Sequence, residues 1–207
     1  MRMKNKKVII AIIIIVCVMV TATFIKLWFT SKSDDEVQII NEIKEYGYIL
    51  EDNETDLHKE YFEELVTVLG EKDVDEEAYA ELVTKLFISD FYNLDNKVTK
   101  NNVGGIQYTY SKAQENMVLK AKDTIYKYIE NNIDNGRTQK LPIVSNVEVK
   151  NIEQLEFEYE AEVDDEAFEI ELNWTYKEDL GYQSEAVMIL IHEDNKLAIA
   201  EIRLLEE

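Results

Sequence analysis

A stretch of alternating apolar and acidic residues decides the fold class of this chain. Residues 155–176 read LEFEYEAEVDDEAFEIELNWTY. Apolar side chains at every second position are typical of a strand with one face buried and the other in water. The two alternating runs, 155–163 and 168–176, therefore predict a pair of antiparallel strands, with residues 164–167 as the loop between them.

Further strands are predicted on both sides of this pair. Residues 186–192 are apolar on both faces of the expected strand, and residues 197–204 form the next one. Asp194 and Asn195 between them are a favourable two-residue turn. With a short strand at residues 144–150, the C-terminal part is predicted to be a curved antiparallel meander of about four strands.

Helices are predicted before the strands. Ahead of Pro142 the apolar residues recur at i, i+3 and i+4, the spacing of one helical face. Helices followed by a meander are typical of an α+β fold, with the helices packed on the sheet. The expected helices cover residues 36–50, run from Thr55 or Asp56 to Gly70, begin again at Asp73 or Asp75, and run from Ser111 past Ile133, with residues 93–105 as a loop.

The N-terminus joins a basic tail to a long apolar run. Residues 8–25 carry no charge, and Arg2, Lys4, Lys6 and Lys7 precede them. About 20 apolar residues span a bilayer as a helix. We therefore expect an uncleaved transmembrane helix at residues 8–29. The alternative is a cleaved signal peptide, whose apolar region is usually about 7–15 residues long.

The placement of the basic residues predicts the orientation in the membrane. The positive-inside rule puts the N-terminus in the cytoplasm and the rest of the chain outside the cell membrane. The expected organisation is a cytoplasmic tail (1–7), a transmembrane helix (8–29), a stalk or linker helix (30–55) and an extracytoplasmic α+β domain (56–207).

Composition excludes several classes of protein. The 207 residues include 43 Asp and Glu against 22 Lys and Arg, for a net charge of −21. Nucleic-acid binding needs basic groups on phosphates, so the balance argues against it. The single Cys excludes an intramolecular disulfide framework and a Cys-rich zinc module. The Ile-, Lys- and Asn-rich, Pro-poor usage is compatible with a bacterium of AT-rich genome.

No spacing of residues predicts a catalytic or metal centre. His58 is expected on the surface of a polar helix, and no nucleophile or second carboxylate is tied by spacing to His192. Gly104-Gly105 lacks the pattern of a phosphate loop. The sequence therefore predicts no enzyme, no cofactor and no metal ligand set.

Acidic residues are expected to face one another across the predicted hairpin. In the register that matches the apolar faces, Glu162 lies opposite Glu169 and Glu160 lies opposite Glu171. Opposed like charges destabilise a sheet. We expect a solvated outer face that tolerates this repulsion. The alternative is neutralisation by a cation or by a basic partner surface.

The order of the elements supports a family resemblance. Helices, then a long helix, then a four-stranded meander resemble the nuclear-transport-factor-2-like (cystatin-like) fold. A short basic tail, one span and such an outer domain are similar to the assembly-factor subunits of bacterial conjugation and type IV secretion channels. The resemblance covers residues 36–205 by element order alone. It implies a curved sheet around a cone-shaped pocket, which is catalytic in some members and filled in others.

The last hairpin predicts a surface that must be covered. One face of strands 186–192 and 197–204 reads as core, and the opposite face is also apolar, so a second cover is needed. The cover is the stalk helix, a second copy of the chain or another partner, and we expect self-association or partner docking. The candidate interface residues are Met188, Leu190, His192, Leu197 and Ile199.

These patterns together predict a single-pass membrane protein with a non-enzymatic extracytoplasmic interaction domain. It would act as a scaffold subunit of an envelope or transfer complex. The alternative is a small-ligand-binding domain that uses the cone between helices and sheet. The candidate pocket-lining residues are then Tyr79, Phe87, Trp174 and Tyr176.

Overall fold

A computed structural model describes residues 38–160 and 162–205 of the chain. The chain divides after residue 38 into two compact units, and almost all described residues belong to the second. The expected basic tail and transmembrane helix lie outside the described residues, as does the start of the stalk. Within the described residues, no helix is both long and apolar enough to cross a membrane.

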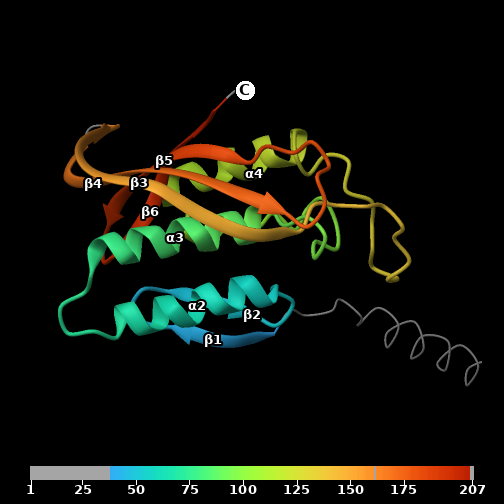
Figure 1. The fold of residues 1–207 in the computed structure, drawn as a ribbon, viewed down its shortest axis with the longest axis horizontal. Helices are drawn as coiled ribbons and strands as arrows, with labels where there is room; N and C mark the ends of the chain where they lie inside the picture. The colour runs from blue at the N-terminus through green and yellow to red at the C-terminus, as the bar shows by residue number, and fades with distance from the viewer. Residues whose placement is uncertain (1–37, 161, 206–207) are drawn as a thin grey trace, which may run out of the picture. The chain divides into compact units, whose positions relative to one another are not determined.

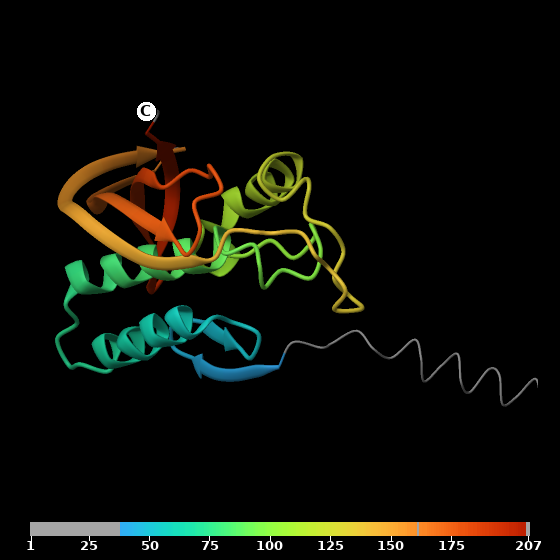
Figure 2. The ribbon, with the colours of Figure 1, turned by 45° about the vertical axis from the view of Figure 1, so that its right-hand side comes forward.

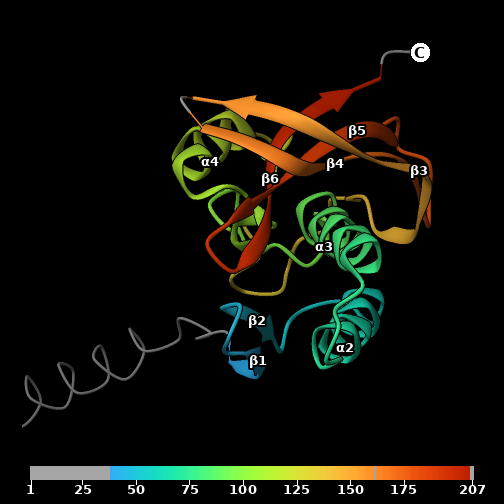
Figure 3. The same ribbon diagram turned by 90° about the vertical axis from the view of Figure 1, so that its left-hand side faces the viewer.

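The second unit is an α+β fold with three helices and an antiparallel four-stranded sheet of order β3-β4-β5-β6 (Figure 1). This confirms the predicted fold class. Figure 3 shows α3 between this sheet and α2, with a small hairpin beside α2. The elements are β1 (Ile39–Ile43), β2 (Tyr48–Glu51), α2 (Asp56–Leu69), α3 (Glu76–Phe91), the short 3₁₀ turns η1 (Ile106–Tyr108) and η2 (Ser111–Ala113), α4 (Gln114–Asp123), β3 (Val144–Tyr159), β4 (Glu162–Tyr176), β5 (Glu185–Glu193) and β6 (Lys196–Leu204).

Local capping residues set the ends of α2 and α3, as predicted. The side chain of Thr55 accepts a hydrogen bond from the His58 amide, and α2 ends at Gly70. Asp75 caps α3 by accepting from the Ala78 amide at 3.1 Å. Each bond satisfies an amide that the helix itself leaves unpaired, so these bounds follow from short-range chemistry.

The expected helix over residues 36–50 is wrong, because residues 39–51 form the β1–β2 hairpin. Gly47 in its turn has a φ of +72°, which favours glycine and breaks a helix. Tyr48 and Leu50 are buried while Ile49 and Glu51 are half-buried, and this alternation is the period of a strand. The few apolar residues of this segment fit both periods, so the pattern alone was ambiguous.

The helix expected from Ser111 past Ile133 is much shorter. It begins with the 3₁₀ turn η2, and α4 ends at Asp123. Tyr126 lies just beyond this end, fully buried, and its hydroxyl donates to the Phe91 carbonyl oxygen at 2.7 Å. This long-range contact favours a non-helical backbone after Asp123, although the apolar spacing of a helix continues to Ile133.

The strands of the long hairpin meet at a different place from the one predicted. Tyr159 pairs with Glu162, and Leu155 pairs with Ala167, so the turn lies at Glu160 and not at residues 164–167. Glu160 has a φ of +55° there. The alternation continues through the true turn, so periodicity could not locate it. The short strand expected at residues 144–150 is the first part of β3.

Bulges give this hairpin its curvature. The β3–β4 register shifts near residues 149–151 and 155–157. Each extra residue bends a strand and increases its twist. Figure 2 shows β3 and β4 bending strongly along their length. As a result the tip residues Leu155, Phe157 and Tyr159 fold over the sheet. They pack against a cluster of buried residues on one of its faces.

The sheet is packed on both faces. The larger core lies between one face, α3, α2 and the small hairpin, and it includes Phe168, Ile170 and Leu172. The opposite face holds a second cluster, which the tip of the β3–β4 hairpin covers. Its buried members are Tyr110, Ala167, Ile189, Ile191 and Ala198.

Candidate functional site

The candidate interface on β5 and β6 is covered by the chain itself. The Tyr48 hydroxyl of β2 donates to the Leu197 carbonyl oxygen at 2.9 Å, and the Leu197 amide donates to the Tyr79 hydroxyl of α3 at 3.0 Å. The β1–β2 hairpin and α3 thus cover the apolar face of β5 and β6 for which the sequence did not identify a partner. This corrects the expected docking surface, since Met188, Leu190, Leu197 and Ile199 are all buried.

The fifth residue of that set, His192, lies near the end of β5, an inner strand of the sheet, with its side chain 37% exposed. Its Nδ1 atom lies 3.0 Å from an Asp164 carboxylate oxygen, which also accepts from the His192 amide at 2.7 Å. Its Nε2 atom lies 3.8 Å from Glu76 of α3. Asp164, expected at a solvated hairpin tip, therefore holds the side chain and backbone of His192.

The candidate pocket-lining residues pack into the core in separate places. Tyr79 bonds with Tyr48 at 2.7 Å, and Phe87 stacks on Phe91. Trp174 packs against Tyr92 and donates to the hydroxyl of Tyr176 at 2.7 Å. These pairings use the aromatic faces and polar ends of the four side chains. Their packing partners are different, so the four side chains are not gathered into one set of contacts.

The acidic strand face differs from the predicted one. Glu162 does not oppose Glu169, and Glu160 does not oppose Glu171, because the register is different. The like-charged pair that does occur is Glu153 opposite Glu169.

Some carboxylates of the sheet form ion pairs within the chain. Arg203 of β6 forms ion pairs with Glu169 and, at 3.2 Å, with Glu201. Glu160 pairs with Lys112 at 2.7 Å. Among the described residues, no group of three or more His, Cys, Asp and Glu side chains is arranged to hold a metal ion.

A buried charged network lies where sequence analysis found no site. Asp90 at the end of α3 forms an ion pair with Lys97, and both side chains are almost fully buried. Asp90 also accepts a hydrogen bond of 2.6 Å from the Gly105 amide. The Gly104 amide donates to the Tyr126 hydroxyl at 3.1 Å. The loop between α3 and α4 is therefore fastened to the core through Asp90 and Tyr126.

His58 belongs to this buried region, which corrects its expected place on the surface. It is completely buried, and its Nδ1 lies 2.9 Å from the Ser89 hydroxyl. Because Ser89 donates to the Leu86 carbonyl oxygen, its own oxygen accepts from Nδ1–H. Nε2 then accepts from Tyr108. Burial lowers the pKa of His58 to about 4, so the ring is neutral at pH 7.

The charges of the network are set by burial and by their neighbours. Burial alone raises the pKa of Asp90, but Lys97 and His58 outweigh it and hold that pKa below its ordinary value. Glu54 lies nearby, and burial, followed by the charge of Asp90, raises its pKa to about 7. Every buried side-chain nitrogen and oxygen in the described residues has a hydrogen-bond partner. The network is thus saturated internally, and we assign it to holding the loop.

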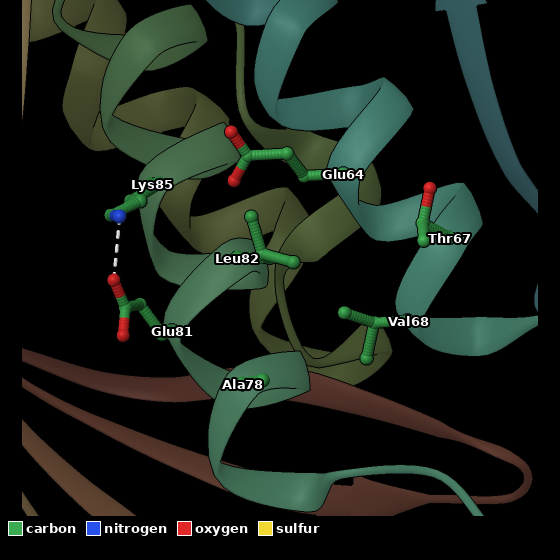
Figure 4. Close-up of a pocket in the computed structure, with 7 residues that line it drawn as sticks. All are labelled: Glu64, Thr67, Val68, Ala78, Glu81, Leu82 and Lys85. Atoms are coloured by element: carbon green, nitrogen blue, oxygen red, sulfur yellow. Dashed lines mark ion pairs between the residues drawn. The ribbon is translucent and has the colours of Figure 1, made fainter. Parts of the chain in front are cut away.

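The described residues form a surface groove between α2 and α3, called the α2–α3 groove. It is a cavity of about 360 Å³ lined by Glu64, Thr67, Val68, Ala78, Glu81, Leu82 and Lys85. Figure 4 shows Val68 and Leu82 in the space between the two helices, with Glu64 beside them. Sequence analysis missed the groove. The only signal was Val68, which lies at the margin of the apolar stripe of α2.

Comparison with known proteins gives no relative for this chain. No protein-family model matches it, and neither a curated protein nor a solved structure shows a significant match.

Proposed function

We propose that the chain is a single-pass membrane protein whose acidic C-terminal domain is a non-enzymatic interaction module outside the cytoplasm. In this role it is a scaffold subunit of an envelope or transfer complex. The proposal rests on the contrast between two regions of the domain, the charged network around Asp90 and the α2–α3 groove. The charged network around Asp90 is buried and saturated, whereas the α2–α3 groove offers apolar side chains between surface carboxylates. Such a surface suits binding of another protein.

The membrane placement and the family resemblance are part of this proposal. The uncharged run at residues 8–25 and the basic residues before it support an anchor with the N-terminus in the cytoplasm. The order of helices followed by a four-stranded meander supports the resemblance to the nuclear-transport-factor-2-like fold and to the assembly factors of bacterial secretion channels, whereas the short α4 and the β1–β2 hairpin depart from the expected order.

Cysteine labelling tests the placement. In a Cys17→Ser background, a membrane-impermeant maleimide added to intact cells should label Lys100→Cys, in an exposed loop, but not Lys4→Cys. Labelling of Lys4→Cys only after permeabilisation completes the expected pattern. Equal protection of both positions in intact cells would contradict the orientation.

Crosslinking in the native membrane tests the scaffold role. The full-length protein is crosslinked, purified under denaturing conditions and identified with its partners by mass spectrometry. We expect envelope or channel components in amounts comparable to the protein itself. Recovery of the protein alone, across crosslinkers of several lengths, would contradict a scaffold role.

A further inference from the structure

Each helix contributes one stripe of side chains to the α2–α3 groove. Residues at i, i+3, i+4 and i+7 share one side of a helix. The stripe on α2 therefore extends for about one turn, or about 6 Å, and the stripe on α3 for about two turns, or about 10 Å. On α2 it consists of Glu64, Thr67 and Val68, and on α3 of Ala78, Glu81, Leu82 and Lys85.

The floor of the groove is apolar and its margin is acidic. Leu82 is buried beneath the groove and Val68 is half-buried, so Val68 supplies more of the open apolar surface than Leu82 does. Glu81 pairs with Lys85 at 2.5 Å, and Lys85 also lies over the ring of Tyr61. Glu64 is exposed and forms no ion pair with any described residue. One carboxylate beside the apolar floor is thus left for a cation.

The surroundings of the groove strengthen this negative charge. Residues 56–85 contain ten Asp and Glu against three Lys. A surface of one sign attracts oppositely charged partners and repels partners of the same sign. Burial of apolar side chains of such a partner against the floor of the groove adds to this attraction.

We propose that the α2–α3 groove binds a cationic amphipathic helix of a partner protein. This rests on the proposed function as an interaction module and adds the site and the chemistry of the partner. Apolar side chains of the partner, spaced by three and four residues, fill the space between Val68 and Leu82. A Lys or Arg of the partner pairs with Glu64. The partner helix lies between α2 and α3, as a third helix packs on a helical pair.

Synthetic peptides and the purified full-length chain, kept in detergent, test this proposal. The probe is a fluorescent peptide of about 14 residues, long enough to form a helix, with Leu at helical spacing and Lys elsewhere. Two matched peptides carry Glu in place of every Lys, or the same Leu and Lys in scrambled order. Fluorescence anisotropy at physiological salt reports binding. The variants are Glu64→Lys and Val68→Glu in the groove, and Glu156→Lys, which makes the same charge change on exposed β3.

We expect saturable binding of the ordered Lys peptide alone. Glu64→Lys should weaken it about tenfold, because it replaces an attraction by a repulsion. Val68→Glu should weaken it at least as much, and Glu156→Lys less than twofold. Circular dichroism and melting temperature establish that each variant is folded.

Three results would overturn the proposal. They are the absence of saturable binding, equal binding of the scrambled or acidic peptide, and equal weakening by Glu64→Lys and Glu156→Lys. The last result would show diffuse attraction to an acidic protein. These measurements need no native partner. They can therefore fail while membrane crosslinking still identifies a partner elsewhere on the domain, and the two proposals are tested separately.

Discussion

The amide of Gly105 donates a hydrogen bond of 2.6 Å to a carboxylate oxygen of Asp90, which lies fifteen residues earlier in the chain. Lys97 holds the other oxygen of the same carboxylate. One buried side chain thus joins the end of α3 to both ends of the loop that follows it. Stability of this region should depend on that carboxylate more than on any surface charge nearby.

Removing one partner of the buried ion pair should destabilise the protein strongly. Lys97→Met leaves the Asp90 charge buried without its cation, and breaking such a pair costs about 3–5 kcal/mol. Asp90→Asn with Lys97→Met should be less destabilising than the sum of the single changes. Urea unfolding of the four proteins measures this coupling. Lys100→Met, in the same loop but exposed, is the control and should cost less than about 0.5 kcal/mol. A strictly additive double variant would contradict the pairing.

Gly104 should tolerate no side chain. A Cβ atom built there lies 2.1 Å from an Asp90 carboxylate oxygen, so an alanine must displace the buried ion pair. We expect Gly104→Ala to lower the free energy of unfolding by about 1–3 kcal/mol or more, as overpacking does. Gly136→Ala is the matched control, since nothing lies within 4 Å of its Cβ position. Equal melting temperatures for the two variants would show that the close approach at Gly104 is not maintained in solution.

Features of the fold that depend on residues close together in the sequence could be predicted, such as helix caps and a tight turn. The sequence placed the start of α2 at Thr55 or Asp56 and that of α3 at Asp73 or Asp75, and Thr55 and Asp75 are the caps, because the cap bond forms within three residues. The two-residue turn at Asp194-Asn195 was predicted from its residue types, and His192 pairs with Leu197 across it. The α+β class followed from the change of period alone. These features require no knowledge of the rest of the fold.

Features that depend on distant contacts could not be predicted. The hydroxyl of Tyr126 contacts Phe91, and this contact places the residues after α4. The network of Asp90 brings together residues from α2, α3 and a loop, and no spacing marks it. Gly104-Gly105 was considered only as a phosphate loop, although the pair is needed for close approach of the backbone to Asp90. The groove was missed because it depends on how two helices pack.

Arg203 should offset the repulsion between Glu153 and Glu169. These carboxylates lie opposite each other on β3 and β4, and Arg203 pairs with Glu169. Because the groups are partly exposed, Arg203→Met should cost only about 0.2–1 kcal/mol. The loss should shrink in high salt, which screens the repulsion. Adding Glu153→Gln should recover part of the stability. A salt-independent loss with no recovery would mean that Arg203 acts through packing alone.

Glu54 and His58 should give the stability of the protein opposite pH dependences. The pKa of Glu54 rises from 4.5 to about 7, so its contribution is complete below about pH 4.5 and is lost as the pH rises through 7. The pKa of His58 falls from 6.5 to about 4, so its contribution is complete above about pH 6.5 and is lost as the pH falls toward 4. The two effects overlap between these limits, and a variant is needed to separate them.

Glu54→Gln isolates the contribution of the carboxyl group. The amide keeps an oxygen for the Asn96 side chain but does not ionise. At about pH 8 the wild type bears a charge beside Asp90 that the variant lacks, so the variant should be more stable by about 1–3 kcal/mol. At about pH 4.5 both side chains are neutral in the folded state, and the difference should nearly vanish. Urea unfolding at both pH values measures this, with exposed Glu63→Gln as the control. A variant that is no more stable than wild type at about pH 8 would refute the raised pKa, because an ordinary carboxylate at this position costs nothing to ionise.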